Sequence, residues 1–226
     1  MNDLLLLLGM MILPIIAQLG VTGTFNKYSG VSSSRGITAE QAARMILDSN
    51  GLYNIRIKRV SGHLSDHFSM KEGVIRLSDS VYGSTSIAAI GVAAHECGHA
   101  CQHAEKYAPI VIRSAIVPAV NICSQLWYLV FILGVFMFET FGFLTYVGIA
   151  MFGAVVLFQL VTLPTELDAS HRALKTLEGQ YILEKDEISK ARKVLTAAAM
   201  TYVTALVTSL MQLLRLILRV IITFQS

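Results

Sequence analysis

The chain has 226 residues, of which 54% are hydrophobic and 15% are charged, and its formal net charge is +3. A mean hydropathy of +0.60 is too high for an ordinary soluble domain, so the composition predicts a membrane protein. The mild, dispersed positive charge lacks the basic stripe of a nucleic-acid-binding protein, and three cysteines without a secreted-scaffold spacing provide no disulfide framework.

The first apolar stretch runs from Leu4 to Leu19. It follows Met1-Asn2-Asp3, which lacks the positive charge of a secretory signal, and no small-residue cleavage site stands out. We therefore predict a retained transmembrane helix in residues 1–20. Residues 21–35 are rich in Gly, Ser and Thr and are predicted to form a linker.

Residues 21–114 are predicted to contain a small α/β module. Capping, alternation and turn residues place its elements. In chain order they are a helix from Thr38 to Asn50, a strand from Tyr53 to Val60, a turn-rich stretch from Ser61 to Gly73, a strand from Val74 to Ser78 and a helix that begins at Thr85 or Ser86. A strand beside this last helix can add an extended peptide by backbone hydrogen bonds.

The last helix of the module carries the motif His95-Glu96-Cys97-Gly98-His99. Residues four apart lie one turn apart on the same helix face, so His95 and His99 can offer two imidazole nitrogens to one zinc ion. In zinc hydrolases with this spacing, the glutamate after the first histidine takes the proton from the metal-bound water. Glu96 is therefore the candidate catalytic residue. The alternative is two ordinary histidines on an amphipathic helix.

A catalytic zinc site needs a third protein ligand and keeps the fourth position for water. His103 lies about 12 Å along the helix axis from His95, too far for both to bind one ion. Glu166 is the better candidate because it ends a strongly apolar segment, where a carboxylate without a cationic partner is costly. The alternative is a solvated helix start. We predict that His95, His99 and Glu166 hold one Zn²⁺ per chain.

Residues 115–163 are predicted to form a transmembrane hairpin. Ala115–Phe138 and Phe141–Leu163 are apolar stretches of 24 and 23 residues, separated only by Glu139-Thr140. Each can cross a bilayer, and so short a link makes them antiparallel. Because a hairpin returns the chain to its starting side, Glu166 emerges on the side of the His95 helix.

Residues 164–196 are predicted to be a polar helical segment on that side, and residues 197–226 a fourth transmembrane helix or, alternatively, a helix on the membrane surface. Lys and Arg number 10 in residues 21–114 and 6 in residues 164–196, and the positive-inside rule predicts that both segments lie in the cytoplasm. The shorter segment carries this argument, because the rule applies to short loops. The predicted fold is thus a mainly α, multi-pass protein of the cell membrane, with four transmembrane helices and a small cytosolic α/β zinc-peptidase module.

Three runs of the chain, Gly62–His67, Val92–His103 and Leu163–Ser170, resemble the bacterial YugP-type family of neutral zinc metallopeptidases, and the resemblance covers nearly the whole chain. More distantly, the chain resembles the integral-membrane gluzincins, in which two histidines and a downstream glutamate bind zinc and the active site faces the cytosol. The resemblance implies a protease of membrane or membrane-proximal proteins. In those distant relatives an aspartate four residues after the glutamate orients a histidine, whereas Ser170 stands at that position here and Asp168 lies at a different helical angle.

We therefore predict a zinc endopeptidase with Glu96 as general base, a protein or peptide substrate, and the lipid bilayer as its environment. Such enzymes usually have an additional group that stabilises the oxyanion formed during the reaction. The candidates for this group are His67, His171, Arg172 and Tyr82, and the sequence does not rank them. One alternative is a zinc-binding membrane scaffold without turnover. A protease that depends on a membrane-protein partner or on a second copy of the chain fits the sequence equally well. A transporter is disfavoured because the chain shows no interrupted repeats.

Overall fold

The computed structural model describes residues 3–224, which form seven helices and one three-stranded sheet. The helices are α1 (Asp3–Ser29), α2 (Ala39–Ser49), α3 (Ile87–Ala104), α4 (Ala108–Phe136), α5 (Phe138–Phe141), α6 (Phe143–Gly179) and α7 (Lys185–Phe224). The strands are β1 (Arg56–Val60), β2 (His67–Ser69) and β3 (Val74–Ser78). The mainly helical class predicted from the sequence is confirmed.

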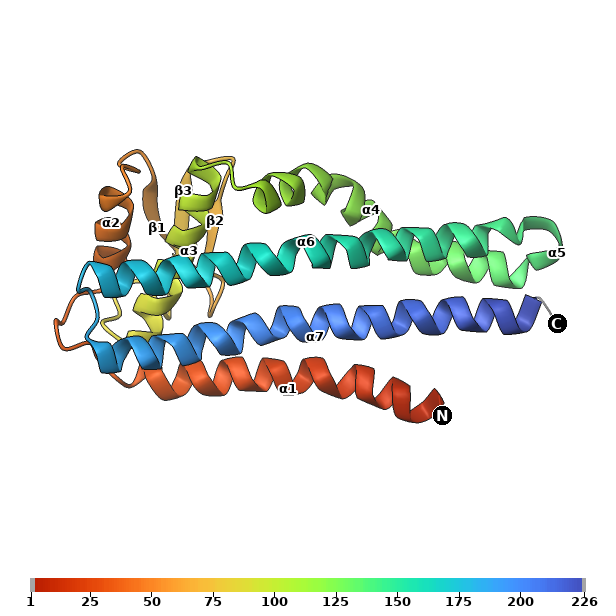
Figure 1. Ribbon diagram of the computed structural model, residues 1–226, viewed down its shortest axis with the longest axis horizontal. Helices are drawn as coiled ribbons and strands as arrows, with labels where there is room; N and C mark the ends of the chain where they lie inside the picture. The colour runs from red at the N-terminus through yellow and green to blue at the C-terminus, as the bar shows by residue number, and fades with distance from the viewer. Residues whose placement is uncertain (1–2, 225–226) are drawn as a thin grey trace.

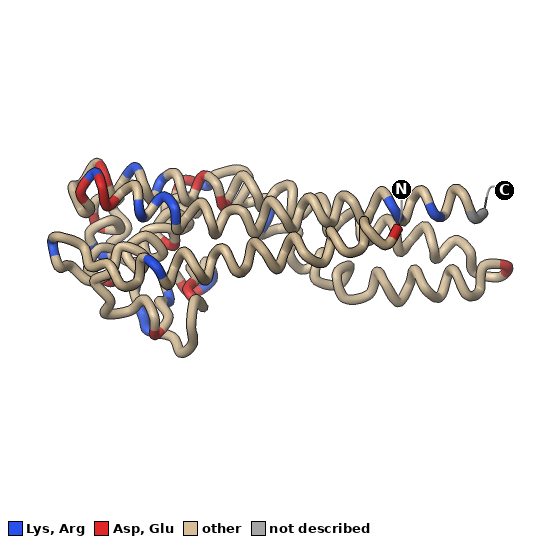
Figure 2. Tube along the Cα trace, turned by 90° about the horizontal axis from the view of Figure 1, so that it is seen from below, with Lys and Arg blue, Asp and Glu red and all other residues tan. Residues whose placement is uncertain are grey.

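Long helices dominate the shape of the molecule. In Figure 1, α1, α6 and α7 run along the long axis, while α2, α3 and the sheet gather at one end. Four helices, α1, α4, α6 and α7, are long and apolar enough to cross a membrane. Charged residues concentrate at the end with the sheet, and the long helical shafts are almost free of them (Figure 2). This distribution agrees with a bundle in a bilayer that carries a water-exposed module at one end.

The helix α1 is longer than the sequence predicted. It continues to Ser29, so residues 21–29 are helical where a linker was expected. The reason is burial, since Phe25 and Tyr28 on its last turns join the core of the module. Along its length α1 packs beside α7, which runs in the opposite direction (Figure 1), and an ion pair between Asp3 and Arg219 joins the two helices near their far ends.

The polar segment expected at residues 164–196 is divided between two long helices. The helix α6 continues without a break past Pro164 to Gly179, and α7 begins at Lys185. Ile182 and Leu183 in the turn between them are buried in the module core. Both long helices therefore extend rigidly from the apolar bundle into the module.

The sheet has the order β1-β3-β2, with β1 parallel and β2 antiparallel to β3. The central strand is buried at Val74, Ile75 and Leu77, which is the continuous apolar pattern of a strand covered on both faces. The strand β2 was missed in the sequence, because it has only three residues within a turn-rich stretch. As an edge strand, it has one side without a strand partner in the sheet.

Small residues let α3 lie deep in the module. The Ser86 hydroxyl caps its start by accepting a hydrogen bond from the backbone N–H of Ala89 at 3.2 Å. Further along, Gly98 meets the backbone of α6 so closely that an added Cβ would stand 2.5 Å from the carbonyl oxygen of Ala169. The two helices thus touch backbone to backbone at this point.

The helices α4 and α6 pack side by side as an antiparallel hairpin, with α5 in the turn between them. Gly148 allows the close contact, because a Cβ there would overlap the backbone of Phe131. Figure 1 shows a bend in α4, and Pro118 inside this helix accounts for it, since proline removes a helical hydrogen bond.

The close contact at Gly98 leads to a prediction about stability, and Gly91 on the same helix provides the control. Gly98→Ala is expected to lower the stability of the detergent-solubilised protein by about 1–3 kcal/mol, because the new methyl group meets backbone that cannot rotate away. Gly91→Ala on the same helix places its Cβ 3.6 Å from the Cβ of Ala191, which is ordinary contact, and is expected to be neutral or stabilising by up to about 1 kcal/mol. Thermal unfolding of the two variants measures the difference, and equal melting temperatures would contradict the backbone contact.

Candidate metal centre

The contact between α3 and α6 brings three metal-binding side chains together. His95 and His99 lie one turn apart on α3, and Glu166 faces them from α6. Their nearest ligand atoms all lie within 4.8 Å of one another, the one group of three such residues found in the described part of the chain. The Oε2 atom of Glu166 is 3.2 Å from Nε2 of His95 and 3.4 Å from Nε2 of His99. Three donor atoms therefore converge on one point.

The environment of this group suits a divalent cation. The side chain of Glu166 is only 3% exposed, and a carboxylate at such a position requires positive partners. Burial favours the neutral form of His99, but the hydrogen bond with Glu166 and the charges of Glu96 and Glu166 outweigh it and raise the pKa of His99. Two imidazoles and one carboxylate in a negative environment are the donor set of catalytic zinc sites.

Each histidine is oriented by a hydrogen bond on its other ring nitrogen. Nδ1 of His95 lies 3.1 Å from the hydroxyl of Ser170, and Nδ1 of His99 lies 3.0 Å from Oε1 of Gln102. Because an amide oxygen only accepts, Nδ1 of His99 carries the hydrogen. When His99 is neutral, Nε2 then has the lone pair that a metal ion needs.

A network of polar groups that runs from the buried Gln102 to the surface fixes this side chain in turn. Its side-chain nitrogen donates to the carbonyl of Thr165 and to Oδ2 of Asp168, both at 2.8 Å. Arg172 binds the same Asp168 oxygen at 2.6 Å and pairs with Glu105 at 2.7 Å. Ser170 thus contacts His95 directly, while Asp168 acts on His99 through Gln102.

The remaining oxygen of Glu166 is held by a cation from α4. Arg113 donates to Oε1 of Glu166 at 2.8 Å, so one carboxylate oxygen faces the arginine while the other faces the two histidines. Tyr202 on α7 forms a further interaction with Glu166. These contacts fix the carboxylate in one orientation before any metal binds.

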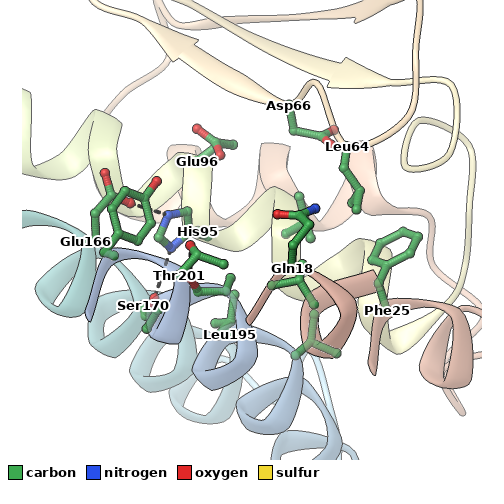
Figure 3. A pocket seen from close by; sticks show the side chains of 16 residues that line it. Gln18, Phe25, Leu64, Asp66, His95, Glu96, Glu166, Ser170, Leu195 and Thr201 are labelled. Carbon is green, nitrogen blue, oxygen red and sulfur yellow. Dashed lines mark hydrogen bonds and ion pairs between the residues drawn. The ribbon is translucent and has the colours of Figure 1, made fainter. Parts of the chain in front are cut away.

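Two cavities meet at the three ligands. One, of about 280 Å³, lies between α1, α3, α6 and α7, and the other, of about 250 Å³, lies between β2, α3 and α4. Both are lined by His95, Glu96, Glu166 and Tyr202. Figure 3 shows the first cavity with His95 and Glu96 projecting from α3. Glu96 is 8% exposed, and no ion pair or hydrogen bond holds its carboxylate among the described residues.

The structure shows which of the other candidate residues lie near the three ligands. Of the four oxyanion candidates, only His67 lines one of these two cavities. Arg172 is engaged with Asp168 and Glu105, Tyr82 packs against the module core, and His171 is exposed on α6. His103 lies beside the ring of Phe68, outside the ligand group.

The cysteines of α3 face away from the ligands. Cys97 is fully buried and its thiol donates to the carbonyl of Ala43. Burial raises the pKa of Cys97 well above its usual value and raises that of Cys101 to about 11. Both thiols therefore stay protonated and unreactive near neutral pH, despite the position of Cys97 next to Glu96.

Sequence reasoning missed Gln102, Arg113 and Tyr202. Gln102 could have been found, since a residue three positions after His99 lies on the same helix face. Arg113 precedes an apolar stretch and looked like an ordinary flanking charge. Tyr202 gives no local signal, because only the packing of α7 against α6 brings it to Glu166.

The fold and the site together define a helical protein with four helices long and apolar enough to cross a membrane and a candidate metal site of two histidines and one glutamate. A profile of the family described as "Putative neutral zinc metallopeptidase" matches residues 3–221. The chain is 44% identical over 204 residues to the "Putative membrane protease YugP" of Bacillus subtilis (strain 168), covering 89% of each chain. The chain belongs to this zinc metallopeptidase family. No solved structure matches it.

The metal centre makes a graded prediction. The purified wild type is expected to contain about one zinc ion per chain, and Glu166→Ala is expected to lose it because a ligand and the buried negative charge are both removed. Gln102→Ala leaves all three ligands but frees the ring of His99, and is expected to weaken zinc binding by about 10- to 100-fold. Elemental analysis and competition with a chelator measure both effects. Glu178→Ala, an exposed change on the same helix as Glu166, is the control, and zinc retained in Glu166→Ala would move the third ligand elsewhere.

Proposed function

We propose that this protein is a membrane-embedded zinc endopeptidase of the gluzincin type, which hydrolyses peptide bonds of membrane or membrane-proximal proteins. The observation that carries the proposal is the position of Glu96. Its unpaired carboxylate stands beside the three ligands, at the wall shared by two cavities. A general base must lie within reach of both the attacking water and the substrate.

Zinc bound by His95, His99 and Glu166 would supply a Lewis acid and lower the pKa of a coordinated water. Glu96 takes the proton of the attacking water and then delivers it to the leaving amine. Gln102 favours the tautomer of His99 that binds metal through Nε2, and Ser170 holds the ring of His95 in position. Tyr202, whose side chain lines both cavities, is the residue best placed to donate a hydrogen bond to the developing oxyanion, with His67 as the other candidate.

The arrangement of the cavities favours cleavage inside a chain over removal of a terminal residue. A cavity lies on each side of the ligands, so an extended substrate can continue in both directions from the scissile bond. The second cavity is lined by His67, Phe68 and Met70, at the side of the edge strand β2. An extended peptide can form backbone hydrogen bonds with such an edge.

A purely structural metal site fits these observations less well. Structural zinc sites are closed, with four protein ligands, whereas this group has three ligands among the described residues and opens to two cavities. A scaffold without turnover would also gain nothing from a buried, unpaired glutamate at this position, because such a group lowers stability.

The distribution of charge supports an active site that faces the cytoplasm. The module and the ends of α6 and α7 beside it contain 16 of the 18 Lys and Arg residues, with 10 in residues 21–114 and 6 in residues 164–196. Segments close to transmembrane helices that are rich in Lys and Arg stay on the cytoplasmic side. Glu139 in the hairpin turn then lies outside the cell.

Substitution of the proposed base separates metal binding from catalysis. Glu96→Gln is expected to keep about one zinc ion per chain and to lose nearly all cleavage of an unfolded membrane-protein substrate, because a neutral amide cannot accept the proton. Zinc content and single-turnover cleavage in detergent are measured on the same sample. Glu178→Gln is the control, and undiminished cleavage by Glu96→Gln would refute the assignment.

The proposed topology is tested by labelling. In a Cys123→Ser background, Glu139→Cys is expected to react with a membrane-impermeant maleimide added to intact cells, and Lys185→Cys only after lysis. The buried Cys97 and Cys101 contribute little label in the folded protein. The reverse pattern would place the metal centre outside the cytoplasm.

A further inference from the structure

The cavity between α1, α3, α6 and α7 has two chemically different ends. In Figure 3, His95, Glu166 and Ser170 cluster at one end, while Phe25 and Leu64 lie at the other, with Asp66 and Gln18 beside them. The wall between them is apolar and comes mainly from α7, with Val194, Leu195, Ala198 and Ala199. On the opposite side α1 contributes Val21 and Phe25.

We propose that this cavity is the specificity pocket of the enzyme and receives a bulky apolar side chain of the substrate, from the residue next to the scissile bond. The inference rests on the proposed function and adds to it the class of substrate residue. Its second part is that the pocket is formed between two membrane helices, α1 and α7, so the preferred residue comes from an apolar segment of a membrane protein.

The size of the cavity and its lining support a large apolar occupant. At about 280 Å³, it is close to the smallest cavities that hold ligands in proteins, and no Lys or Arg lines it. The alanines at 198 and 199 create the space, because any larger side chain there would fill it. Ala198 is only partly buried and lines the cavity.

The cavity is also lined by polar groups that can form hydrogen bonds with a peptide backbone. Asp66 is held by the backbone N–H and the hydroxyl of Ser78 at 2.7 and 2.9 Å. The hydroxyl of Thr201 donates to the carbonyl of Ala198. Gln18 is exposed on the otherwise apolar face of α1, and its amide is free to bind a carbonyl or N–H of an unwound segment in an environment with little water.

Binding of zinc-directed inhibitors tests the pocket without turnover. Peptidyl hydroxamates that differ only in one side chain, glycine, alanine, leucine or phenylalanine, are titrated into the zinc-loaded wild type. The leucine and phenylalanine compounds are expected to bind roughly 10- to 100-fold more tightly than the glycine compound, the gain from burying one large apolar side chain. Equal affinity across the four compounds would overturn the proposal.

Two variants of the cavity wall and one control variant test whether the preference for large side chains arises in this cavity. Ala198→Phe is expected to abolish the preference for large side chains while keeping the glycine compound bound. Leu195→Ala enlarges the same wall and is expected to favour phenylalanine over leucine, which provides a second test if Ala198→Phe does not fold. Met200→Phe adds a ring two residues away on the exposed side of α7 and is expected to leave all four affinities unchanged. An unchanged preference in both pocket variants would place the side chain elsewhere.

The same samples distinguish failure of the pocket from failure of the proposed function. Cleavage of a membrane-protein substrate by a wild type that binds all four hydroxamates equally would refute the pocket and keep the endopeptidase. Side-chain-dependent binding that Ala198→Phe abolishes, without cleavage of any substrate by the wild type, would keep the pocket and refute the endopeptidase.

Discussion

The candidate metal centre depends on one backbone contact between two helices. Gly98 of α3 lies against the carbonyl of Ala169 in α6, and this contact sets the distance from the two histidines to Glu166. Helix α3 alone can present two imidazoles, but the third ligand reaches them only if the helix axes come unusually close. The motif therefore combines the candidate ligands His95 and His99 and the proposed base Glu96 with the packing residue Gly98, within about one turn of helix.

The contact between the two helices also places the buried carboxylate of Glu166 among positive partners. Glu166 is nearly inaccessible to water and is surrounded by Arg113, His95 and His99. The arginine binds one carboxylate oxygen and leaves the other directed at the imidazoles, which is the geometry that a metal ligand needs. The cost of desolvating a carboxylate is offset by this pairing, and the site is preorganised because Gln102, Asp168 and Ser170 restrict the rings on the other side.

Much of this was available from the sequence, for physical reasons that differ between parts of the chain. The spacing of His95 and His99 follows from the helical repeat, and the four apolar stretches from the thickness of a bilayer. Glu166 could be selected because a hairpin returns the chain to its starting side. The helical extension of α1 to Ser29 was missed because residues rich in Gly, Ser and Thr are weak helix formers, and burial of Phe25 and Tyr28 overrides that preference. Arg113 and Tyr202 reach the site only through tertiary packing, which leaves no pattern in the local sequence.

The pairing of α1 with α7 has a consequence for biosynthesis. The ribosome makes α1 first and α7 more than 150 residues later, yet the cavity beside Glu96 has walls from both helices. A nascent chain that ends after α6 already contains His95, Glu96, His99 and Glu166 but lacks Tyr202 and the apolar wall beside it. The cavity between α1, α3, α6 and α7 is therefore complete only when the last long helix docks, so an incomplete translation product has the three candidate ligands but lacks the apolar wall of this cavity.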